Sequence, residues 1–309
     1  MSKPEFPAVD LEKVLAAEHL PAMPQTAIRL LEMSADPSQG PAEFALPIEA
    51  DPGLTVQVLR FVNSSFFGFR DEISSVKRAI TMVGVRTVKN FVLWSAVFSM
   101  IPNPRCGLFD LKALWQDSLR RALFARTLSR LLGLSEAEET FAAALLQDMA
   151  VPLLAKEVPD AYAKLFDARR RSQSRVRLSQ LETYAFGWHH ATAAGIAARR
   201  WHLPETLSAL VEDHLSVEQH LARGEAEPGK LAVGLSALLP PVDDPQWSDF
   251  AKFESCCEQI RPPDGPPLEK LLDQVDQEFA EIAPLLRIPM PRVPLVANYH
   301  QVVASASNC

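Results

Sequence analysis

The segment from Leu114 to Met149 constrains the fold more than any other part of this chain. Apolar residues recur at helical spacing as far as Gly133, where a helix would stop, and a second helix follows. The second helix contains the apolar run Phe141–Leu146 and leads into Asp148, while the first helix carries Asp117. Because an isolated buried carboxylate is strongly destabilising, the fold must pair Asp148, hydrogen-bond it or bind it to a metal ion.

The amino-acid composition favours helices. The 309 residues are 48% apolar, enough to bury one large domain or two smaller ones. Alanine, leucine, glutamate and arginine are abundant, and all four are good helix formers. Twelve glycines and the near absence of β-branched runs argue against a β-sandwich or a barrel. The sequence therefore predicts an all-α protein.

Start and stop signals divide the first hundred residues into short helices. Pro21 and Pro24 end any helix there, since proline lacks an amide donor and restricts the residue before it. Asp51 followed by proline marks a helix start. The helices predicted here are Val9–Leu20, Thr26–Ser34, Pro41–Glu49, one that opens at Asp51, and Val85–Met100.

Beyond Leu221 the helical signals are sparser. Prolines on both sides of Asp264 and Gly265 make a stiff connector, and we expect the tail after Pro289 to be extended or mobile. The helices expected in this region are Lys230–Leu239, Gln246–Ile260 and Leu268–Leu286.

Charge and targeting signals narrow the functional classes. A net charge of -7 argues against a nucleic-acid binder, and four cysteines without a C-x-x-C pair suit a reducing cytosol. The first residues lack the apolar core of a secretory signal. The longest strongly apolar run, Phe91–Ile101, is about half the length that spans a bilayer. We therefore expect a cytoplasmic protein that contacts neither nucleic acid nor a membrane.

Several short motifs follow one another in the order and spacing of one family. They are Leu20–Pro24, Asp51–Thr55, Val62–Gly68, Ile73–Ser75, Ile80–Val85, Leu114–Ser118, Leu145–Met149, His190, Trp201–Pro204 and His214. With these motifs the chain resembles the HDOD family, whose name means HD-related output domain. The resemblance covers roughly Leu11 to Leu221.

The resemblance implies a multi-helix HDOD fold in a bacterial signal-transduction protein. A short N-terminal helical part, residues 11–101, would pack on a degenerate HD-like bundle, residues 111–221. Residues 222–309 would form a C-terminal helical extension with a proline-rich tail.

The resemblance also locates a vestigial pocket. HD-type phosphohydrolases hold one or two divalent metal ions with a first histidine and a following His-Asp pair. By the resemblance, the first histidine falls on Asp117 and the pair on Gln147 and Asp148. The neutral amide of Gln147 is a poor ligand for a transition metal. His190 and His214 complete the pocket.

We therefore expect no metal cofactor. If a metal is bound, the expected ligands are Asp117, Asp148, His190 and His214. Otherwise Asp148 is a structural survivor that caps a helix or hydrogen-bonds backbone within the core, and a salt bridge from Arg120 or Arg121 would neutralise Asp117.

Other charged residues leave alternatives open. Arg169, Arg170 and Arg171, followed by Arg175 and Arg177, are either a solvated helix end or a site for an anion or an acidic partner. We expect His202 and His220 to be exposed and without a role.

The function implied by these features is a non-catalytic signalling module. It would contact a signalling protein partner or sense a ligand in the vestigial pocket. One alternative is a metal-dependent phosphohydrolase of a nucleotide or cyclic dinucleotide, and another is a nucleotide-binding sensor without turnover.

Overall fold

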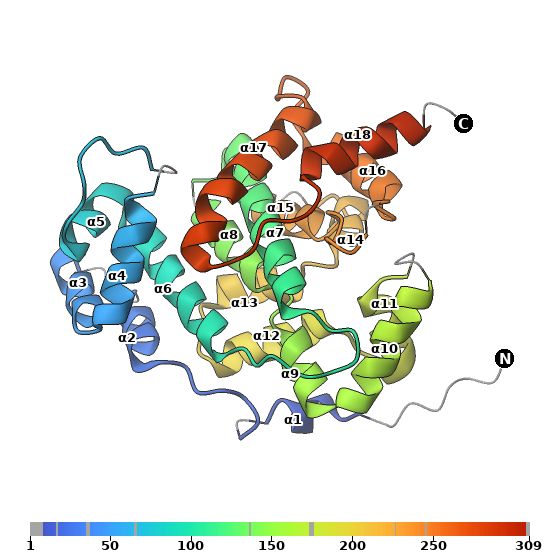
Figure 1. Cartoon of the computed structure of the whole chain (residues 1–309), viewed down its shortest axis with the longest axis horizontal. Coiled ribbons are helices and arrows are strands. Elements are labelled where there is room, and N and C mark those ends of the chain that lie inside the picture. The colour runs from blue at the N-terminus through green and yellow to red at the C-terminus, as the bar shows by residue number, and fades with distance from the viewer. Residues whose placement is uncertain are drawn as a thin grey trace.

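Helices account for all the regular secondary structure in the part of the chain that can be described. The computed structural model describes residues 9–16, 18–34, 38–64, 67–135, 137–172, 176–225, 227–244 and 246–306, and no strand occurs within them (Figure 1). The predicted all-α class is therefore confirmed. None of the described helices combines the length and the apolar character that crossing a bilayer requires.

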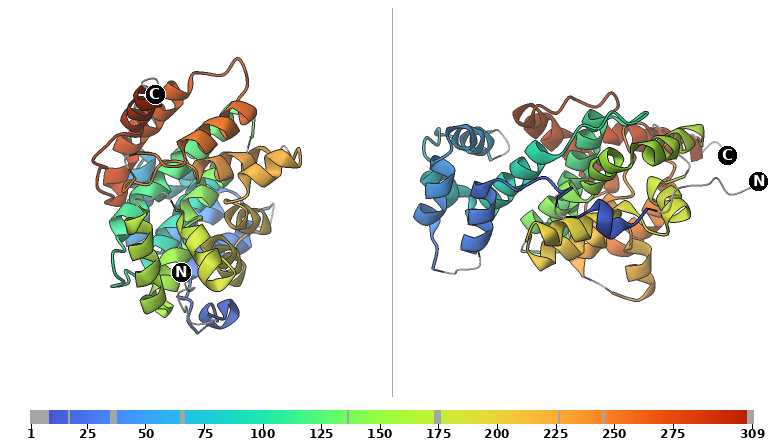
Figure 2. Two further views of the ribbon diagram at one scale, coloured as in Figure 1. Left: turned by 90° about the vertical axis from the view of Figure 1, so that its right-hand side faces the viewer. Right: turned by 90° about the horizontal axis from the view of Figure 1, so that it is seen from below.

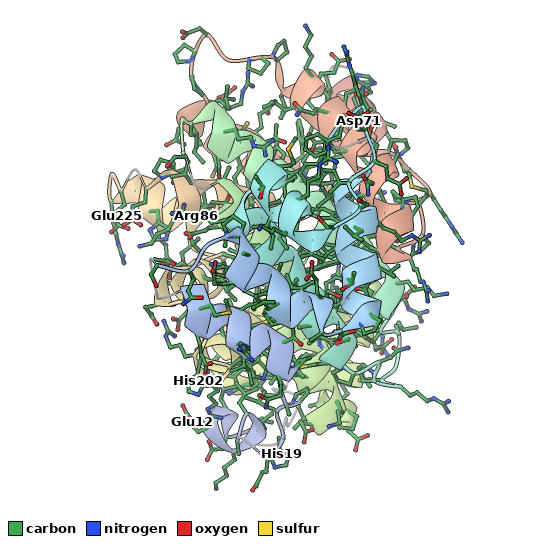
Figure 3. The ribbon with its side chains drawn as sticks, turned by 90° about the vertical axis from the view of Figure 1, so that its left-hand side faces the viewer. Glu12, His19, Asp71, Arg86, His202 and Glu225 are labelled. Atoms are coloured by element: carbon green, nitrogen blue, oxygen red, sulfur yellow. The ribbon has the colours of Figure 1, made fainter. Side chains whose placement is uncertain are left out.

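Helices α2 to α6 form a lobe at one end of the elongated molecule (Figure 2). They are α2 (Gln25–Ser34), α3 (Pro41–Glu49), α4 (Pro52–Val62), α5 (Val76–Val83) and α6 (Val85–Met100). Helix α1 (Leu11–Val14) lies away from the lobe, at the bottom of Figure 1. Helix α6 packs on α2, α4 and α5 and also reaches the central helix α8, Ala137–Leu146. Seen from this end, the lobe stands in front of the rest of the molecule, with exposed Asp71 and Arg86 on it (Figure 3).

Side-chain caps and a clamped loop define the lobe. The carboxylate of Asp51 accepts a hydrogen bond from the amide of Leu54 and so begins α4 as predicted. The amide side chain of Asn63 accepts from the backbone nitrogen of Ile73 at 2.7 Å and donates to its carbonyl at 2.8 Å. The polar residues at the end of α4 therefore hold the next loop, while the adjacent Ser65 and Phe66 lie outside the described residues.

The helix expected over Val9–Leu20 is wrong in length, because α1 ends at Val14. The chain after it passes the C-terminal end of α12 (His190–Arg200). Arg200 donates to the carbonyl of Leu15, and the indole of Trp201 donates to the carbonyl of Pro21 at 2.9 Å. The contact with Arg200 takes the carbonyl group of Leu15, which a longer helix would have used.

The central bundle is built around the long helix α7. Its helices are α7 (Leu111–Leu131), α8, α9 (Ala150–Glu157), α10 (Pro159–Arg171), α11 (Leu178–Phe186), α12, α13 (Glu205–Glu212) and α14 (Val217–Ala222). Helix α7 packs along α8, and α12 pairs with α13. A Cβ atom at Gly195 of α12 would lie 2.7 Å from the Cβ of Glu212, so α12 and α13 approach closely only because residue 195 is glycine.

The C-terminal helices cover one side of α7. They are α15 (Pro228–Ser236), α16 (Phe250–Ile260), α17 (Leu268–Ile282), the 3-10 turn η1 (Ala283–Leu286) and α18 (Leu295–Ala306). Helices α15 and α17 pack on α7, and η1 touches α4 of the lobe. The extended tail expected after Pro289 is wrong, since α18 is helical. Its first amides, of Leu295 and Val296, are bound by the carboxylate of Asp276 at 2.9 Å each.

Buried polar side chains of α7 fasten this extension. The amide of Gln116 donates to the carbonyl of Pro289 at 2.8 Å, and Arg120 donates to the carbonyl of Val293. Arg126, 1% exposed, pairs with Glu278 of α17 at 2.8 Å. The next residue after Arg120, Arg121, points into the bundle instead, where the candidate site lies.

Candidate functional site

Three side chains from separate helix ends converge inside the bundle. Asp148 lies in the turn after α8, His190 is the first residue of α12, and His214 lies in the turn after α13. Oδ1 of Asp148 is 3.3 Å from Nε2 of His190 and 3.8 Å from Nε2 of His214. One donor atom from each of the three lies within 4.8 Å of the others, and all three side chains are buried. We call these residues the cluster.

Glu182 of α11 holds His190. One carboxylate oxygen of Glu182 accepts from the backbone amide of His190 at 2.8 Å and lies 2.6 Å from Nδ1 of its ring. The other oxygen accepts from the hydroxyl of Tyr162 at 2.7 Å. Glu182 is fully buried, so its contacts with protein groups replace those with water. The orientation of the His190 ring is therefore fixed from behind.

His214 is fixed in a similar way by a backbone carbonyl. Its Nδ1 lies 2.7 Å from the carbonyl oxygen of Val211. Because a carbonyl can only accept, Nδ1 must carry the proton, and Nε2 of the neutral ring presents a lone pair. Burial, together with the positive charges of His190 and Arg121, lowers the pKa of His214 to about 3. Its buried Nε2 has no hydrogen-bond partner among the described residues.

Arg121 of α7 neutralises Asp148 from the opposite side. The guanidinium donates to Oδ2 of Asp148, while Oδ1 faces the two imidazoles. Burial by itself would raise the pKa of Asp148, but Arg121 and His190 outweigh it and hold this pKa well below its usual range. Burial by itself would lower the pKa of His190. The carboxylates of Glu182 and Asp148 outweigh it and raise this pKa to about 10.

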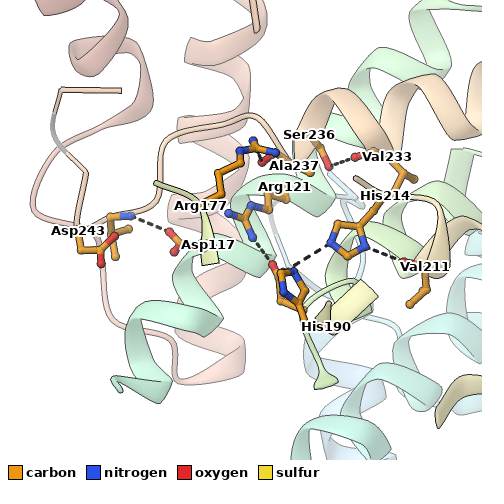
Figure 4. Close-up of polar contacts among 12 residues, drawn as sticks. Asp117, Arg121, Arg177, His190, Val211, His214, Val233, Ser236, Ala237 and Asp243 are labelled. Atoms are coloured by element: carbon orange, nitrogen blue, oxygen red, sulfur yellow. Dashed lines mark hydrogen bonds and ion pairs between the residues drawn. The ribbon is translucent and has the colours of Figure 1, made fainter. Parts of the chain in front are cut away.

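Asp117 stands apart from the cluster. Its carboxylate accepts a hydrogen bond from the amide of Val242 at 2.8 Å, and Arg121 lies between it and the two histidines (Figure 4). Burial raises the pKa of Asp117 to about 7, with Asp243 adding to this rise and Arg121 opposing it. Of the four expected ligands, the structure therefore brings together Asp148, His190 and His214 and leaves Asp117 outside.

Gln147 is fully buried beside the cluster. Neither its amide nitrogen nor its amide oxygen has a hydrogen-bond partner among the described residues. Such a group costs about 1–3 kcal/mol. The residue that the resemblance aligns with a metal-binding histidine of HD-type phosphohydrolases is therefore not a well-satisfied structural substitute.

Glu182 was missed by reasoning from the sequence. The only signal was its position on the inward side of a short helix, eight residues before His190. An acidic residue four positions after Leu178 looks like any amphipathic helix position, and only the tertiary fold shows that it meets an imidazole.

The arginines between positions 169 and 177 do not converge on one point. Arg169 pairs with Asp243 at 2.9 Å, Arg171 pairs with Asp167, and Arg170 is exposed. Arg177 pairs with Asp249 at 2.7 Å, while Arg175 lies outside the described residues. The carboxylates near these arginines already supply the negative charge that a bound anion would bring.

The expectation that His220 is exposed is wrong, although His202 is exposed as predicted. His220 on α14 is buried, and its Nδ1 lies 2.5 Å from Glu225. The sequence hides this because Glu225 follows the glycine turn after α14 and folds back onto the ring.

The cluster fits a single divalent transition-metal ion. Two imidazoles and one carboxylate are ligands that zinc, iron and manganese accept. Each ring is held at Nδ1 by Glu182 or by the carbonyl of Val211, which is the usual support for a histidine that binds metal through Nε2. The unpartnered Nε2 of His214 is consistent with that use. The two carboxylates that favour a proton on His190 would equally favour a cation in its place.

Comparison with known proteins agrees with this fold. The chain is similar to a candidate phosphohydrolase from Shewanella amazonensis, with 18% identity, a TM-score of 0.65, and 94% of this chain and 97% of that chain covered. It is also similar to an HDOD domain protein of unknown function from Geobacter sulfurreducens, with 18% identity, a TM-score of 0.60, and 97% and 96% of the two chains covered. At these identities the likeness shows the fold.

Sequence comparison supplies the family. The chain is 23% identical over 202 residues to an uncharacterized protein of Treponema pallidum, and this match spans 64% of the chain but only 38% of that relative's length. The model of the HDOD domain matches residues 20–217, which is more than half of the chain. The chain belongs to the HDOD family.

Proposed function

We propose that this chain is a non-catalytic signal-transduction module of the HDOD family. The observation that carries the proposal is the position of Arg121. Its side chain lies between Asp117 and Asp148, two of the positions at which the resemblance places metal ligands of active HD enzymes. With Arg121 there and Gln147 in place of a histidine, three donors converge where a two-metal phosphohydrolase needs more.

The burial of the cluster supports the same proposal. Asp148 is 7% exposed, His190 5% and His214 1%. None of these three residues lines the groove between α14 and α16 or the groove beside α11. A phosphoester would need an opening to reach the cluster, whereas a module that acts through contact with a protein partner would not.

A turnover assay tests the proposal. The full chain, loaded separately with Mn²⁺, Fe²⁺ and Zn²⁺, would be incubated with bis-p-nitrophenyl phosphate, cyclic dinucleotides and guanosine nucleotides. We expect no hydrolysis above that of the His214→Ala variant. Metal-dependent hydrolysis that is lost in both His214→Ala and Asp148→Asn would contradict the proposal.

A metal-dependent phosphohydrolase is the second candidate, and the convergence of Asp148, His190 and His214 favours it. These residues would hold the metal, and the bound ion would lower the pKa of a water molecule and polarise a phosphoester. Glu182 and the carbonyl of Val211 would keep the two rings in place. The assay above separates this candidate from the first.

A nucleotide sensor without turnover is the third candidate. A groove of about 440 Å³ lies beside the cluster and is lined by Ser179, Gln180, Thr183, Tyr184, His189 and Leu215. Two of these residues are direct neighbours of His190 and His214 in the chain. A rise in melting temperature with one nucleotide, absent in a Tyr184→Ala variant, would favour it.

The partner of a contact module would be another signalling protein. Its surface contact is not expected to require the buried cluster. Binding of such a partner should therefore survive His214→Ala and Asp117→Asn, and loss of binding in both variants would favour a ligand-sensing role.

A further inference from the structure

We infer that Arg121 is a built-in cation that fills the space between Asp117 and Asp148, so that the cluster binds one divalent transition-metal ion and not two. The inference rests on the proposed function, because it concerns the same site. Beyond that function, the site would hold two kinds of cation, the guanidinium of Arg121 and one divalent metal ion.

The guanidinium of Arg121 occupies the position of a metal ion between carboxylates. Arg121 follows Asp117 by one helical turn on α7, so the two side chains lie on the same face of the helix. Its guanidinium bonds to Asp148, which comes from the turn after α8, and is attracted by Asp117 and Asp243 as well. A buried positive charge surrounded by carboxylates is the arrangement that a metal ion would otherwise have. Unlike a metal ion, an arginine side chain cannot dissociate.

The two carboxylate oxygens of Asp148 have different partners. Oδ2 accepts from Arg121, while Oδ1 faces Nε2 of His190 and Nε2 of His214. A carboxylate that bridges two metal ions must give one oxygen to each. Here one oxygen is occupied by the protein itself, which leaves one oxygen and two imidazoles for one ion.

Burial of the site supports a single ion as well. Asp148, His190 and His214 are all buried, and the guanidinium of Arg121 already bonds to Asp148. A second divalent ion beside Arg121 would crowd positive charges in a buried volume, which is unfavourable.

Cobalt titration of the metal-free full chain tests the number of ions. Co²⁺ would be added to protein stripped with a chelator, and its visible absorption and the bound cobalt would be measured. We expect one equivalent. His214→Ala should weaken binding by at least tenfold, whereas the matched control His220→Ala, which also alters a buried histidine, should leave it unchanged. No binding by the wild type, two equivalents, or equal effects of the two variants would overturn the inference.

Substitution of Arg121 tests the built-in cation. Arg121→Met keeps the bulk of the side chain without its charge, and Arg120→Met is the matched control, since Arg120 is also buried but binds a carbonyl. We expect both variants to melt at lower temperature in chelator. Co²⁺ or Mn²⁺ should raise the melting temperature of Arg121→Met more than that of the wild type, and its cobalt content should rise above one equivalent. If Arg121→Met and Arg120→Met respond equally to metal, Arg121 is not a substitute for a cation.

The double variant Asp117→Asn/Arg121→Met covers the case in which Arg121→Met alone does not fold. It removes one negative and one positive charge together and should remain at one equivalent of cobalt. A second equivalent in this variant would also overturn the inference.

The two proposals fail in different ways. Hydrolysis by a protein with one bound metal ion would refute the non-catalytic function and leave the inference intact. A protein that binds no cobalt refutes the inference and leaves the signalling proposal standing.

Discussion

The arginines of helix α7 point in two directions, and their partners differ between the two sides of the helix. Toward the bundle, Arg121 meets Asp148 and lies near Asp117, with the histidines of the cluster beyond. Toward the C-terminal helices, Arg120 binds the carbonyl of Val293, and Arg126 binds Glu278, which is still 14% exposed. The first contact belongs to a closed network that includes the two buried histidines, whereas the second contacts fasten the C-terminal helices to α7.

The comparison predicts that the closed network is more sensitive to the loss of one member. Glu182→Ala would leave the charge on His190 without its carboxylate on the Nδ1 side and would remove the acceptor of Tyr162. We expect a loss of about 3–5 kcal/mol in the free energy of unfolding. Urea unfolding at neutral pH measures it. Glu182→Gln keeps an acceptor and should lose less, and a loss below about 1 kcal/mol in Glu182→Ala would show that the network is not closed.

The corresponding change on the other face of α7 should cost less. Arg126→Met would remove the cationic partner of Glu278, but this carboxylate keeps a hydrogen bond from Gln274 at 2.9 Å and can still reach water. We expect a loss of about 2 kcal/mol, since the group left behind is only partly desolvated. The same urea experiment checks it. If Arg126→Met costs more than Glu182→Ala, the distinction between the two faces fails.

The pH dependence of stability sharpens the role of Asp117, at the border of the closed network. Its pKa is about 7 in the folded state against 3.8 for the free side chain, so between these values the folded state binds more protons than the unfolded state. The contribution of Asp117 to stability must therefore fall as the pH rises from about 4 to about 7, by at most about 1.4 kcal/mol per pH unit.

Asp117→Asn isolates this effect. The asparagine oxygen can still accept from the amide of Val242, but it does not titrate. Relative to the wild type, the variant should gain stability as the pH rises through that range and show no gain below pH 4. Parallel stability curves for the two proteins would mean that Asp117 is ionised throughout.

The smallest effect is expected at the helix that closes the extension. Asp276→Ala removes the carboxylate that binds the amides of Leu295 and Val296 at the start of α18. We expect a loss of about 1 kcal/mol, typical of an N-terminal cap. Asp273→Ala, a nearby change whose only described partner is Gln277, should be nearly neutral. Equal losses in the two variants would show that the cap does not hold α18.

Local signals in the sequence were sufficient for much of the fold. Pro41–Glu49 and Val85–Met100 have the predicted bounds, and Asp51 caps α4 as expected, because caps and glycine turns act within a few residues. The predicted domain bounds, 11–221 and 222–309, stay predictions. The demand that buried Asp148 be paired also followed from the sequence, and Arg121 and His190 meet it.

What the sequence could not supply was the choice among long-range partners. The salt bridge was expected at Asp117, yet Arg121 bonds to Asp148, which lies 27 residues away. The helical tail depends on Asp276, and the orientation of His190 depends on Glu182. Each of these contacts joins helices whose packing is decided by the whole core, so no local pattern announces it.

The glycine at position 195 has a consequence for the distance between the two imidazoles. His190 begins the helix on which Gly195 lies, and His214 follows the helix that ends at Glu212. Because Gly195 has no side chain, these two helices can touch, and their separation helps to set the distance between the rings. Any side chain at position 195 would push the helices apart. The geometry of the cluster therefore depends partly on a residue that has no functional group.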